Sequence, residues 1–170
     1  MAGAARPVLM QEYLARMREK LRLVVPGDDD HGLVSELLRC LRLARADYTR
    51  FFRGLGSGEI GDADEFPGEV AALGKWMDRY RARLACEDAH PEGAALARTR
   101  RARMEGVNPR YVLRNHLAQG AIERAERGDY TEIDRLRRAL SDPYSARPEF
   151  RDYEARPPAW SREIVVSCSS

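Results

Sequence analysis

Residues 69–88, EVAALGKWMDRYRARLACED, give the clearest indication of the fold. Their apolar members recur every three or four positions, which places them on one face of a helix. That face consists of Val70, Leu73, Met77, Tyr80 and Leu84, with Trp76 beside it. The spacing therefore predicts a long amphipathic helix, the most regular element of the chain.

Three more helices are predicted before this one. The first covers 8–24 and ends at Pro26-Gly27, with an apolar stripe of Met10, Tyr13, Leu14, Met17, Leu21 and Val24. The acidic triplet 28–30 is predicted to cap the second, whose stripe is Leu33, Val34, Leu37, Leu38 and Leu41. The third is short and begins at Asp47, presenting Tyr48, Phe51, Phe52 and Leu55 before glycines 54, 56 and 58 open a loop to Gly68.

Helices also dominate the chain after residue 88. A polar helix is predicted over 91–105, ended by Gly106. Asn108 and Pro109 predict the N-cap and first residue of a long helix that ends at Gly128. Its expected buried face is Val112, Leu113, Leu117, Ala121, Ile122 and Ala125. Residues 129–132, DYTE, read as a capping box for a last helix carrying Ile133, Leu136 and Leu140.

After Asp142-Pro143 the helical pattern stops. The prolines at 148, 157 and 158, together with Trp160, indicate an extended tail laid over the surface. We therefore expect an all-α fold of about six helices over 8–144, followed by an extended C-terminal tail over 145–170.

Composition limits the classes of protein that need to be considered. The 170 residues include 29 Lys and Arg against 27 Asp and Glu, a net charge of +2, which excludes a polycationic tail. The length fits one domain or a piece of a larger one, and 44% hydrophobic residues favour a packed core over disorder. No window approaches the ~20 apolar residues that span a bilayer, and no targeting segment stands out, so we expect a soluble chain.

Cysteine and histidine usage excludes two further classes. Cys40, Cys86 and Cys168 are odd in number and widely spaced, which argues against a secreted disulfide framework and for reducing surroundings. Zinc is disfavoured because there is no C-x-x-C pair and the three histidines lie far apart.

Two loop motifs match the letters of known ligand sites without their context. Residues 56–61, GSGEIG, have the glycine spacing of a dinucleotide-binding turn, but an aromatic helix rather than a strand precedes them. Asp62 and Asp64 begin a calcium-loop pattern in which Phe66 and Pro67 occupy places required for an oxygen ligand and a glycine. We expect neither a nucleotide cofactor nor calcium at this loop.

Two clusters leave alternatives open. Arg98, Arg100, Arg101 and Arg103 form either a phosphate-binding surface or a solvated helix face, and the latter is favoured because no aromatic residues lie between the arginines. His116 is either catalytic or part of a structural polar network with Arg114, Asn115 and Gln119. The network is favoured, because buried polar groups must be paired.

The chain ends in SCSS, residues 167–170, which places Cys168 third from the end. Prenylation needs a cysteine fourth from the end, so a lipid anchor is excluded. A thiol at a chain end is a candidate redox group, whereas Cys40 and Cys86 lie in predicted helices and are expected to be small buried hydrophobes.

Several stretches, in order from about Leu9 to the last residue, resemble the selenoprotein O family, whose bacterial members are also called YdiU. They are MREKL (17–21), DYTRFF (47–52), WMDRYR (76–81), VNPRYVLRNHLAQ (107–119), AIERAERGD (121–129), PPAW (157–160) and SCSS (167–170). Residues 1–7 do not match the family. The block 107–119 and the ending are the distinctive parts.

The resemblance implies a protein-kinase-like fold that transfers AMP from ATP to Ser, Thr or Tyr hydroxyls of other proteins, using magnesium. It also implies that this chain is only the C-terminal portion. The lysine and glutamate that hold the nucleotide, and the asparagine and aspartate that bind the metal, belong to the upstream part. No catalytic, cofactor-binding or metal-binding residue is therefore assigned here, and the chain alone is predicted to be inactive.

The family places selenocysteine or cysteine third from the end, which corresponds to Cys168, and this residue is thought to pair with a cysteine of the catalytic part. Our leading hypothesis is a helical segment of a cytoplasmic, bacterial-type adenylyltransferase that packs beneath the catalytic region and lends Cys168 as a redox latch. The alternative is a freestanding helical module that binds protein or RNA through the Trp76 helix or the arginine helix. Without its catalytic part, the chain is expected to self-associate through uncovered apolar faces.

Overall fold

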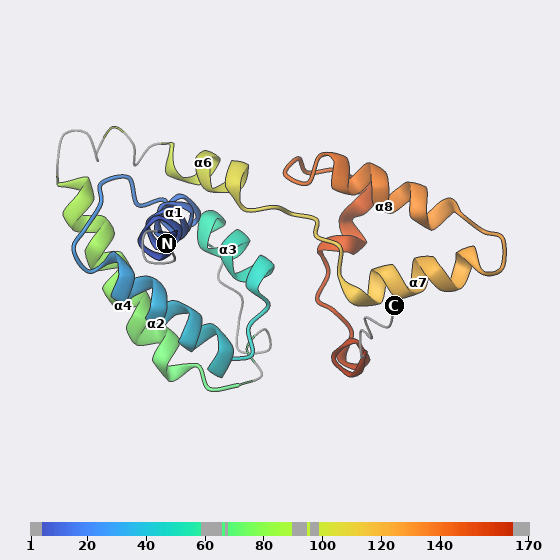
Figure 1. Ribbon diagram of the computed structural model, residues 1–170, viewed down its shortest axis with the longest axis horizontal. Coiled ribbons are helices and arrows are strands. Elements are labelled where there is room, and N and C mark those ends of the chain that lie inside the picture. The colour runs from blue at the N-terminus through green and yellow to red at the C-terminus, as the bar shows by residue number, and fades with distance from the viewer. Residues whose placement is uncertain (1–4, 59–65, 67, 90–94, 96–98, 165–170) are drawn as a thin grey trace. The chain divides into compact units, whose positions relative to one another are not determined.

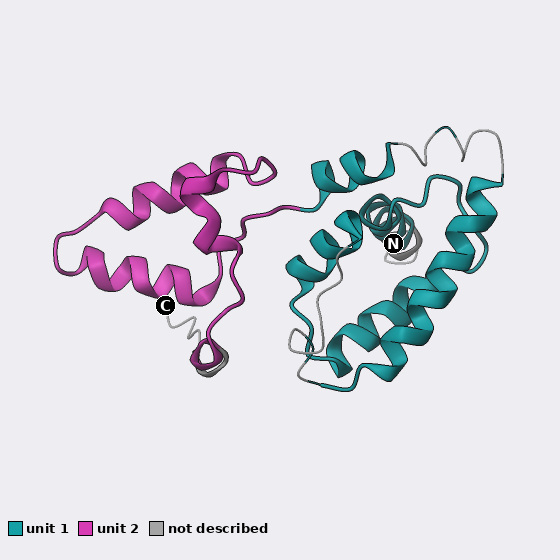
Figure 2. Cartoon of the chain, turned by 180° about the vertical axis from the view of Figure 1, so that it is seen from behind, with its two compact units in different colours: residues 1–108 teal, residues 109–170 magenta. Residues whose placement is uncertain are grey.

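A computed structural model describes residues 5–58, 66, 68–89, 95 and 99–164. Every regular element among them is a helix, as predicted (Figure 1). The chain divides into two compact units, Met1–Asn108 and Pro109–Ser170 (Figure 2). The first contains α1 (Ala5–Leu21), α2 (Asp30–Leu43), α3 (Tyr48–Ser57), α4 (Ala71–Asp88) and α6 (Arg100–Val107). The second contains α7 (Asn115–Ala125), α8 (Thr131–Ser141) and the 3₁₀ helices η2 (Pro148–Glu154) and η3 (Ala159–Glu163).

The core of the first unit is built around Trp76 of α4. Its side chain is fully buried, and its Nε1 donates a hydrogen bond to the Leu33 carbonyl at 2.8 Å. The indole stacks on Tyr80 at 5.1 Å between ring centroids, and the Tyr80 hydroxyl donates to the Leu21 carbonyl at 2.8 Å. The predicted α4 stripe thus packs α4 on α2 and also binds the end of α1.

The first helix is shorter at its C-terminal end than predicted, because α1 ends at Leu21 rather than at residue 24. Arg22 adopts a left-handed conformation with φ 60°. The Arg22 N–H bonds the Glu19 carbonyl and the Leu23 N–H bonds the Arg18 carbonyl, the hydrogen-bond pattern of a Schellman C-cap. The chain therefore turns away before Val24.

The third helix begins where predicted and ends later. Its N-cap Asp47 accepts a hydrogen bond from the Arg50 N–H at 3.0 Å. Of the three glycines predicted to end the helical pattern, Gly54 and Gly56 lie within α3, which continues to Ser57 and stops at Gly58, where φ is 78°. A Cβ on Gly56 would lie 3.2 Å from Met104 Cβ, so this glycine allows α3 to approach α6 closely.

The helix predicted to start at Asn108-Pro109 begins instead at Asn115. Asn108 ends α6, and its buried amide donates to the Lys20 carbonyl at 3.1 Å while its Oδ1 accepts from Lys20 Nζ at 3.3 Å. The next two N–H groups, of Arg110 and Tyr111, both donate to the Pro143 carbonyl. These long-range hydrogen bonds hold 109–114 outside a helix.

The second unit uses the predicted tail as part of its core. Phe150 and Tyr153 of η2 are buried with Tyr111, Ala121, Leu136 and Ala139. The segment after residue 145 is therefore more helical and more buried than an extended tail. The predicted α7 face is only partly correct, because Ala121 is buried while Ile122 is exposed and Leu113, also exposed, precedes the helix.

The turn between α7 and α8 differs in detail from the predicted capping box. Asp129 accepts hydrogen bonds from the Thr131 N–H at 3.0 Å and its hydroxyl at 2.6 Å, which also lower the Asp129 pKa. Glu132 instead accepts a hydrogen bond from the Tyr153 hydroxyl at 2.6 Å. The acidic residue that was expected to cap α8 locally thus ties α8 to η2.

Gly68 provides a test of the packing around α2. A Cβ at this position would lie 2.1 Å from the Leu43 carbonyl oxygen, a backbone atom that cannot rotate away. We expect Gly68→Ala to lower the free energy of unfolding by about 2 kcal/mol, as other overpacked sites do. Gly74→Ala is the control, because nothing lies within 4 Å of its added Cβ in the first turn of α4. There alanine should stabilise the chain by about 0.5–1 kcal/mol. Urea unfolding followed by circular dichroism measures both changes, and equal effects would contradict the packing.

Candidate functional site

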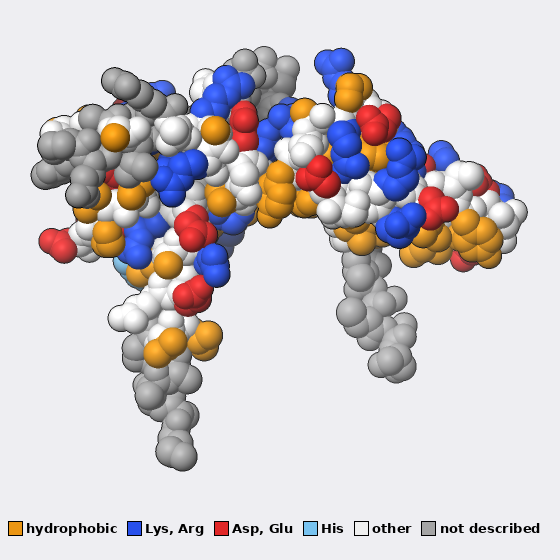
Figure 3. Space-filling view, turned by 90° about the horizontal axis from the view of Figure 1, so that it is seen from above, with side chains coloured by type: hydrophobic (Ala, Val, Ile, Leu, Met, Phe, Trp, Pro, Cys, Tyr) orange, Lys and Arg blue, Asp and Glu red, His pale blue; other side chains and the backbone are white. Residues whose placement is uncertain are grey.

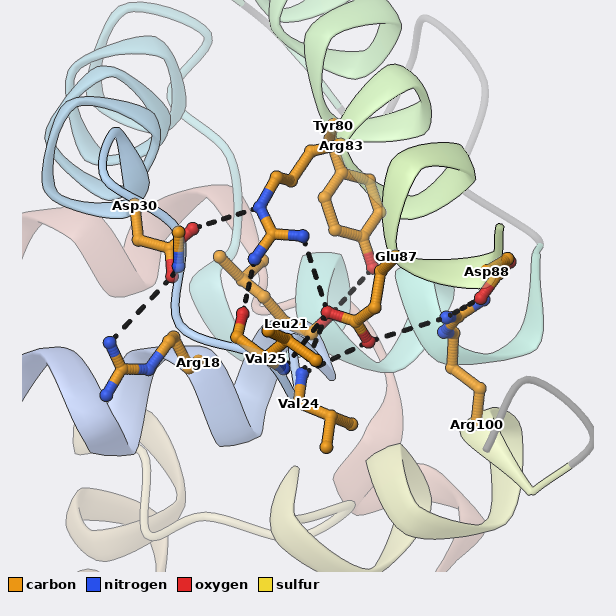
Figure 4. Close-up of polar contacts among 11 residues, drawn as sticks. Arg18, Leu21, Val24, Val25, Asp30, Tyr80, Arg83, Glu87, Asp88 and Arg100 are labelled. Atoms are coloured by element: carbon orange, nitrogen blue, oxygen red, sulfur yellow. Dashed lines mark hydrogen bonds and ion pairs between the residues drawn. The ribbon is translucent and has the colours of Figure 1, made fainter. Parts of the chain in front are cut away.

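The most extensive polar site of the described residues lies where α1, α2, α4 and α6 meet the turn 22–27 (Figure 4). We call it the Glu87 cluster. It comprises Arg18 of α1, Asp30 of α2, Arg83, Glu87 and Asp88 of α4, and Arg100 of α6.

Glu87 projects from the last turn of α4 and is 1% exposed. Its two carboxylate oxygens accept the Val24 N–H at 3.1 and 3.0 Å, and one of them also accepts the Val25 N–H at 3.3 Å. Arg83 Nη1 lies 3.4 Å away and Arg100 Nη2 3.8 Å away. Such dense ligation compensates the cost of burying the charge.

Asp30 is the second buried carboxylate, 2% exposed, at the first position of α2. It accepts the Gly27 N–H at 2.9 Å and forms ion pairs with Arg83 at 3.2 Å and Arg18 at 3.8 Å. The acidic triplet thus does not cap α2 in the predicted way. Asp30 accepts a hydrogen bond from the preceding turn, and Asp29, at the N-cap position, makes no side-chain hydrogen bond to the first turn of the helix.

Arg83 connects these two carboxylates to the turn itself. Its Nη2 donates to the Val25 carbonyl at 2.5 Å, while its Nε and Nη1 point to Asp30 and Glu87. One guanidinium therefore satisfies two buried charges and one backbone carbonyl, which is the geometry that arginine provides and lysine does not.

The arginine helix is partly neutralised by its own chain. Arg100 binds Asp88 through two hydrogen bonds of 3.0 and 2.5 Å, which lower the pKa of Asp88 and raise that of Arg100. Arg101 pairs with Glu105 at 3.1 Å, and Arg98 lies outside the described residues. Figure 3 shows basic and acidic side chains interspersed on the face it draws. Arg100 and Arg101 therefore already have carboxylate partners within the chain.

His116 has an aromatic neighbour that the sequence analysis did not predict. The His116 ring packs edge-on against Trp160 with centroids 6.1 Å apart, and Gln119 donates to Glu123 at 3.1 Å on the surface. Asn115 is exposed at the start of α7. The missed neighbour is Trp160, which lies outside any periodic stretch of sequence.

Cys40 and Cys86 have different environments. Cys40 is fully buried as expected, and burial raises the pKa of its thiol. Cys86 is exposed, so the expectation that it is a buried hydrophobe is wrong. Cys168 lies outside the described residues, as do Gly61, Asp62 and Asp64 of the loop motifs.

Sequence reasoning missed Glu87, the residue on which the cluster depends. The signal was its position, because Glu87 lies three residues after Leu84 and seven after Tyr80, on the apolar face of α4. A carboxylate on a buried helix face needs donors from elsewhere in the fold.

The cluster has the properties of a structural network. Its carboxylates are occupied by backbone and guanidinium donors, and no group of three His, Cys, Asp or Glu within the described ranges is placed to hold a metal ion. Nor is any helix of the described part long and apolar enough to span a membrane. The chemistry of a nucleotide-transfer step is therefore not assigned to these side chains.

Comparison with known proteins first shows that this helical chain is similar to part of a class of protein nucleotidyltransferases. It is 44% identical over 171 residues to the protein nucleotidyltransferase YdiU of Myxococcus xanthus (strain DK1622), covering 96% of this chain and 34% of that protein. It is 43% identical to YdiU of Pseudomonas putida (strain GB-1), covering 99% of this chain and 34% of that protein. For YdiU of Pseudomonas aeruginosa the identity is 42%, over 96% of this chain and 33% of that protein.

The family model described as "Protein adenylyltransferase SelO" matches residues 5–141. The chain therefore belongs to the SelO protein adenylyltransferase family, as the resemblance predicted. It spans about a third of the length of the curated relatives that it matches.

The Glu87 cluster predicts a large effect of a small substitution. Glu87→Gln replaces a carboxylate oxygen by an NH₂ group that faces donors, so we expect a loss of about 3 kcal/mol in the free energy of unfolding. Hydrogen exchange at the Val24 and Val25 amides should accelerate as well.

Glu12→Gln is the matched control for that substitution. The Glu12 side chain is 64% exposed and pairs with Arg16 at 3.2 Å, so its change should stay within about 0.5 kcal/mol. Equal effects of the two substitutions would show that the buried hydrogen bonds contribute little.

Proposed function

We propose that this chain is the helical C-terminal portion of a protein adenylyltransferase, which in its intact form transfers AMP from ATP to Ser, Thr or Tyr hydroxyls of other proteins with magnesium. The observation that carries the proposal is the match itself, which covers nearly all of this chain but about a third of each relative. We assign ATP and magnesium to a catalytic region outside the matched third, because the family resemblance places the nucleotide-binding and metal-binding residues there.

The surface of α1 supports a docking role for this portion. The α1 apolar face, consisting of Leu9, Met10 and Tyr13 with Tyr48 of α3, is between 41% and 68% exposed. Tyr13 lies near Tyr48, and the pKa of Tyr48 is raised by burial and then by Tyr13. The Tyr48 hydroxyl also contacts Met17 Sδ at 3.7 Å.

The α1 apolar face continues a stripe that is buried farther along the same helix. Met17 and Leu21 of that stripe are in the core, whereas Met10 and Tyr13 extend beyond it. An apolar stripe that outruns its own core is typical of an interaction surface. We assign it to the catalytic region that the relatives' additional length provides.

The freestanding module receives less support. Trp76 is wholly buried inside the first unit, and Arg100 and Arg101 have carboxylate partners. The predicted RNA-binding side chains would thus have to exchange ion pairs for phosphate contacts. RNA binding at low salt remains the observation that would favour the module.

The proposal is tested by supplying the missing region in trans. We expect this chain alone to transfer no label from ATP labelled at the α-phosphate to an acceptor protein in the presence of magnesium. The upstream two thirds of the Myxococcus xanthus relative should transfer the label once this chain is added. ATP labelled at the γ-phosphate should label nothing, because AMP rather than phosphate is transferred. Label transfer by this chain alone would contradict the proposal.

The docking surface is tested in the same mixture. Leu9→Lys places a charge on a 68% exposed residue of the α1 apolar face, so it should weaken association with the upstream part without unfolding the chain. Leu113→Lys, at a 57% exposed leucine of the second unit, is the matched control and should leave association unchanged. Analytical ultracentrifugation of the mixture compares the two variants.

We also propose that Cys168 is a redox latch that forms a disulfide with a cysteine of the catalytic region. Two thiols then lose two protons and two electrons to an added oxidant such as diamide, and one S–S bond forms. In the mixed sample, Cys168→Ser should abolish the cross-linked band on a non-reducing gel. Cys86→Ser removes an exposed thiol and should leave the band intact. A cross-linked band that is lost in Cys86→Ser but kept in Cys168→Ser would contradict the assignment of the latch to Cys168.

A further inference from the structure

Arg22 is the side chain in the first unit whose hydrogen-bonding needs are least satisfied by the fold. It is 5% exposed, and its Nε and Nη2 reach no solvent and no acceptor. Burying a guanidinium without an acceptor is unfavourable, and other buried charges of this unit, such as Glu87, are densely ligated.

The two unsatisfied atoms lie on the same edge of the guanidinium. The N–H groups of Nε and Nη2 point in parallel, and that edge matches two oxygens of an oxyanion. Arg22 therefore presents a vacant bidentate donor pair within the described structure.

The backbone at Arg22 is also unfavourable for arginine. Its φ of 60° is at the position of the Schellman motif where glycine is usual, as Gly128 with φ 83° illustrates after α7. An arginine held there, with its side chain unpaired, needs an explanation other than the stability of the turn.

A pocket of about 190 Å³ adjoins this guanidinium, between the C-terminal end of α1 and α6. Glu19, Arg22, Arg103 and Val107 line it. The Glu19 carboxylate is compensated by Arg16 at 3.3 Å. Arg103 is exposed and has no carboxylate partner among the described side chains.

The charges around the pocket favour a multiply charged anion. After burial, the largest influences that lower the Arg22 pKa are the positive charges of Arg103 and Arg100. Arg100 is paired with Asp88 and Glu87 with its own donors, so among the described residues neither Arg22 nor Arg103 has a carboxylate partner of its own. A dianion neutralises both, whereas a carboxylate neutralises one.

We propose that Arg22 and Arg103 form a binding site for an inorganic phosphate ion in this pocket. On binding, the Arg22 side chain turns its enclosed Nε–Nη2 edge into the pocket, where two phosphate oxygens accept the Nε and Nη2 hydrogens, and Arg103 approaches from the exposed side. The site belongs to the first unit alone, so it is independent of the proposed adenylyltransferase function.

Thermal unfolding of the full 170-residue chain in phosphate, compared with sodium chloride at equal ionic strength, tests the site. Phosphate at ~10 times its Kd should raise the Tm of the parent chain by about 3 °C, because it binds the folded state. No rise above the chloride control would overturn the proposal. An equal rise of the Tm in acetate would also overturn the proposal, because it would show that the site binds carboxylates as well as phosphate.

Two glycine substitutions separate the guanidinium from the backbone. Arg22→Gly relieves the left-handed arginine and should abolish the phosphate increment, with a Tm in chloride equal to or above that of the parent. Arg45→Gly makes the same change at φ 49° in the Schellman turn after α2, where the arginine is exposed, and should keep the full increment. An increment that survives in Arg22→Gly would overturn the site.

A further variant and a spectrum guard against misfolding. Arg22→Lys keeps the charge without the bidentate edge and should weaken phosphate binding about tenfold. In the ¹⁵N-labelled parent chain, the Arg22 Nε–H signal should shift as phosphate is added. An unmoved Nε signal, or equal affinity in Arg22→Lys, would overturn the bidentate contact.

Discussion

The first unit depends on one buried carboxylate. Glu87 accepts the N–H groups of Val24 and Val25, and through Arg83 and Arg100 it is linked to Asp30 and Asp88. The turn after α1 passes beside the end of α4 and the start of α2, and none of these segments can shift without exposing an unpaired charge. Because the cost of such a charge exceeds that of most single contacts, this arrangement defines how the four helices meet.

In the second unit, arginine–carboxylate pairs likewise join different elements. Arg135 of α8 forms two hydrogen bonds with Asp152 of η2 at 2.8 and 2.6 Å and lies over the Tyr153 ring at 4.5 Å. Arg110 pairs with Glu154 at 2.7 Å. Many of the arginines and carboxylates that give the chain its near-zero net charge thus pair with one another. For the same reason Arg100 and Arg101, which already have carboxylate partners, do not form a large free basic surface.

Periodicity predicted the helices well and their ends poorly, for a physical reason. The stripe of α4 from Leu73 to Leu84 and the start of α3 at Asp47 are local signals, and both were correct, whereas Val70, predicted at the head of the stripe, is exposed. Helix α1 ends at Leu21 because Arg22 adopts a left-handed conformation, which no periodic pattern announces. Asn108 ends α6 instead of starting a new helix, and its side chain forms hydrogen bonds with Lys20, a residue far away in sequence. Phe150 and Glu87 became buried for the same reason, since partners from other elements surround them.

Two of the features that the fold leaves unsatisfied lie on α1 or directly after it. Its N-terminal half carries exposed Leu9 and Met10, and its C-terminal end carries the unpaired Arg22, while Trp76 and Glu87 nearby are fully packed or ligated. Tyr13 and Arg22 are nine residues apart, which is about 14 Å along a helix. A protein surface that covers the apolar half therefore need not reach the pocket, and an ion in the pocket need not touch that surface. The helix is thus suited to two independent contacts, one apolar and one ionic, because their physical demands are separated along its length.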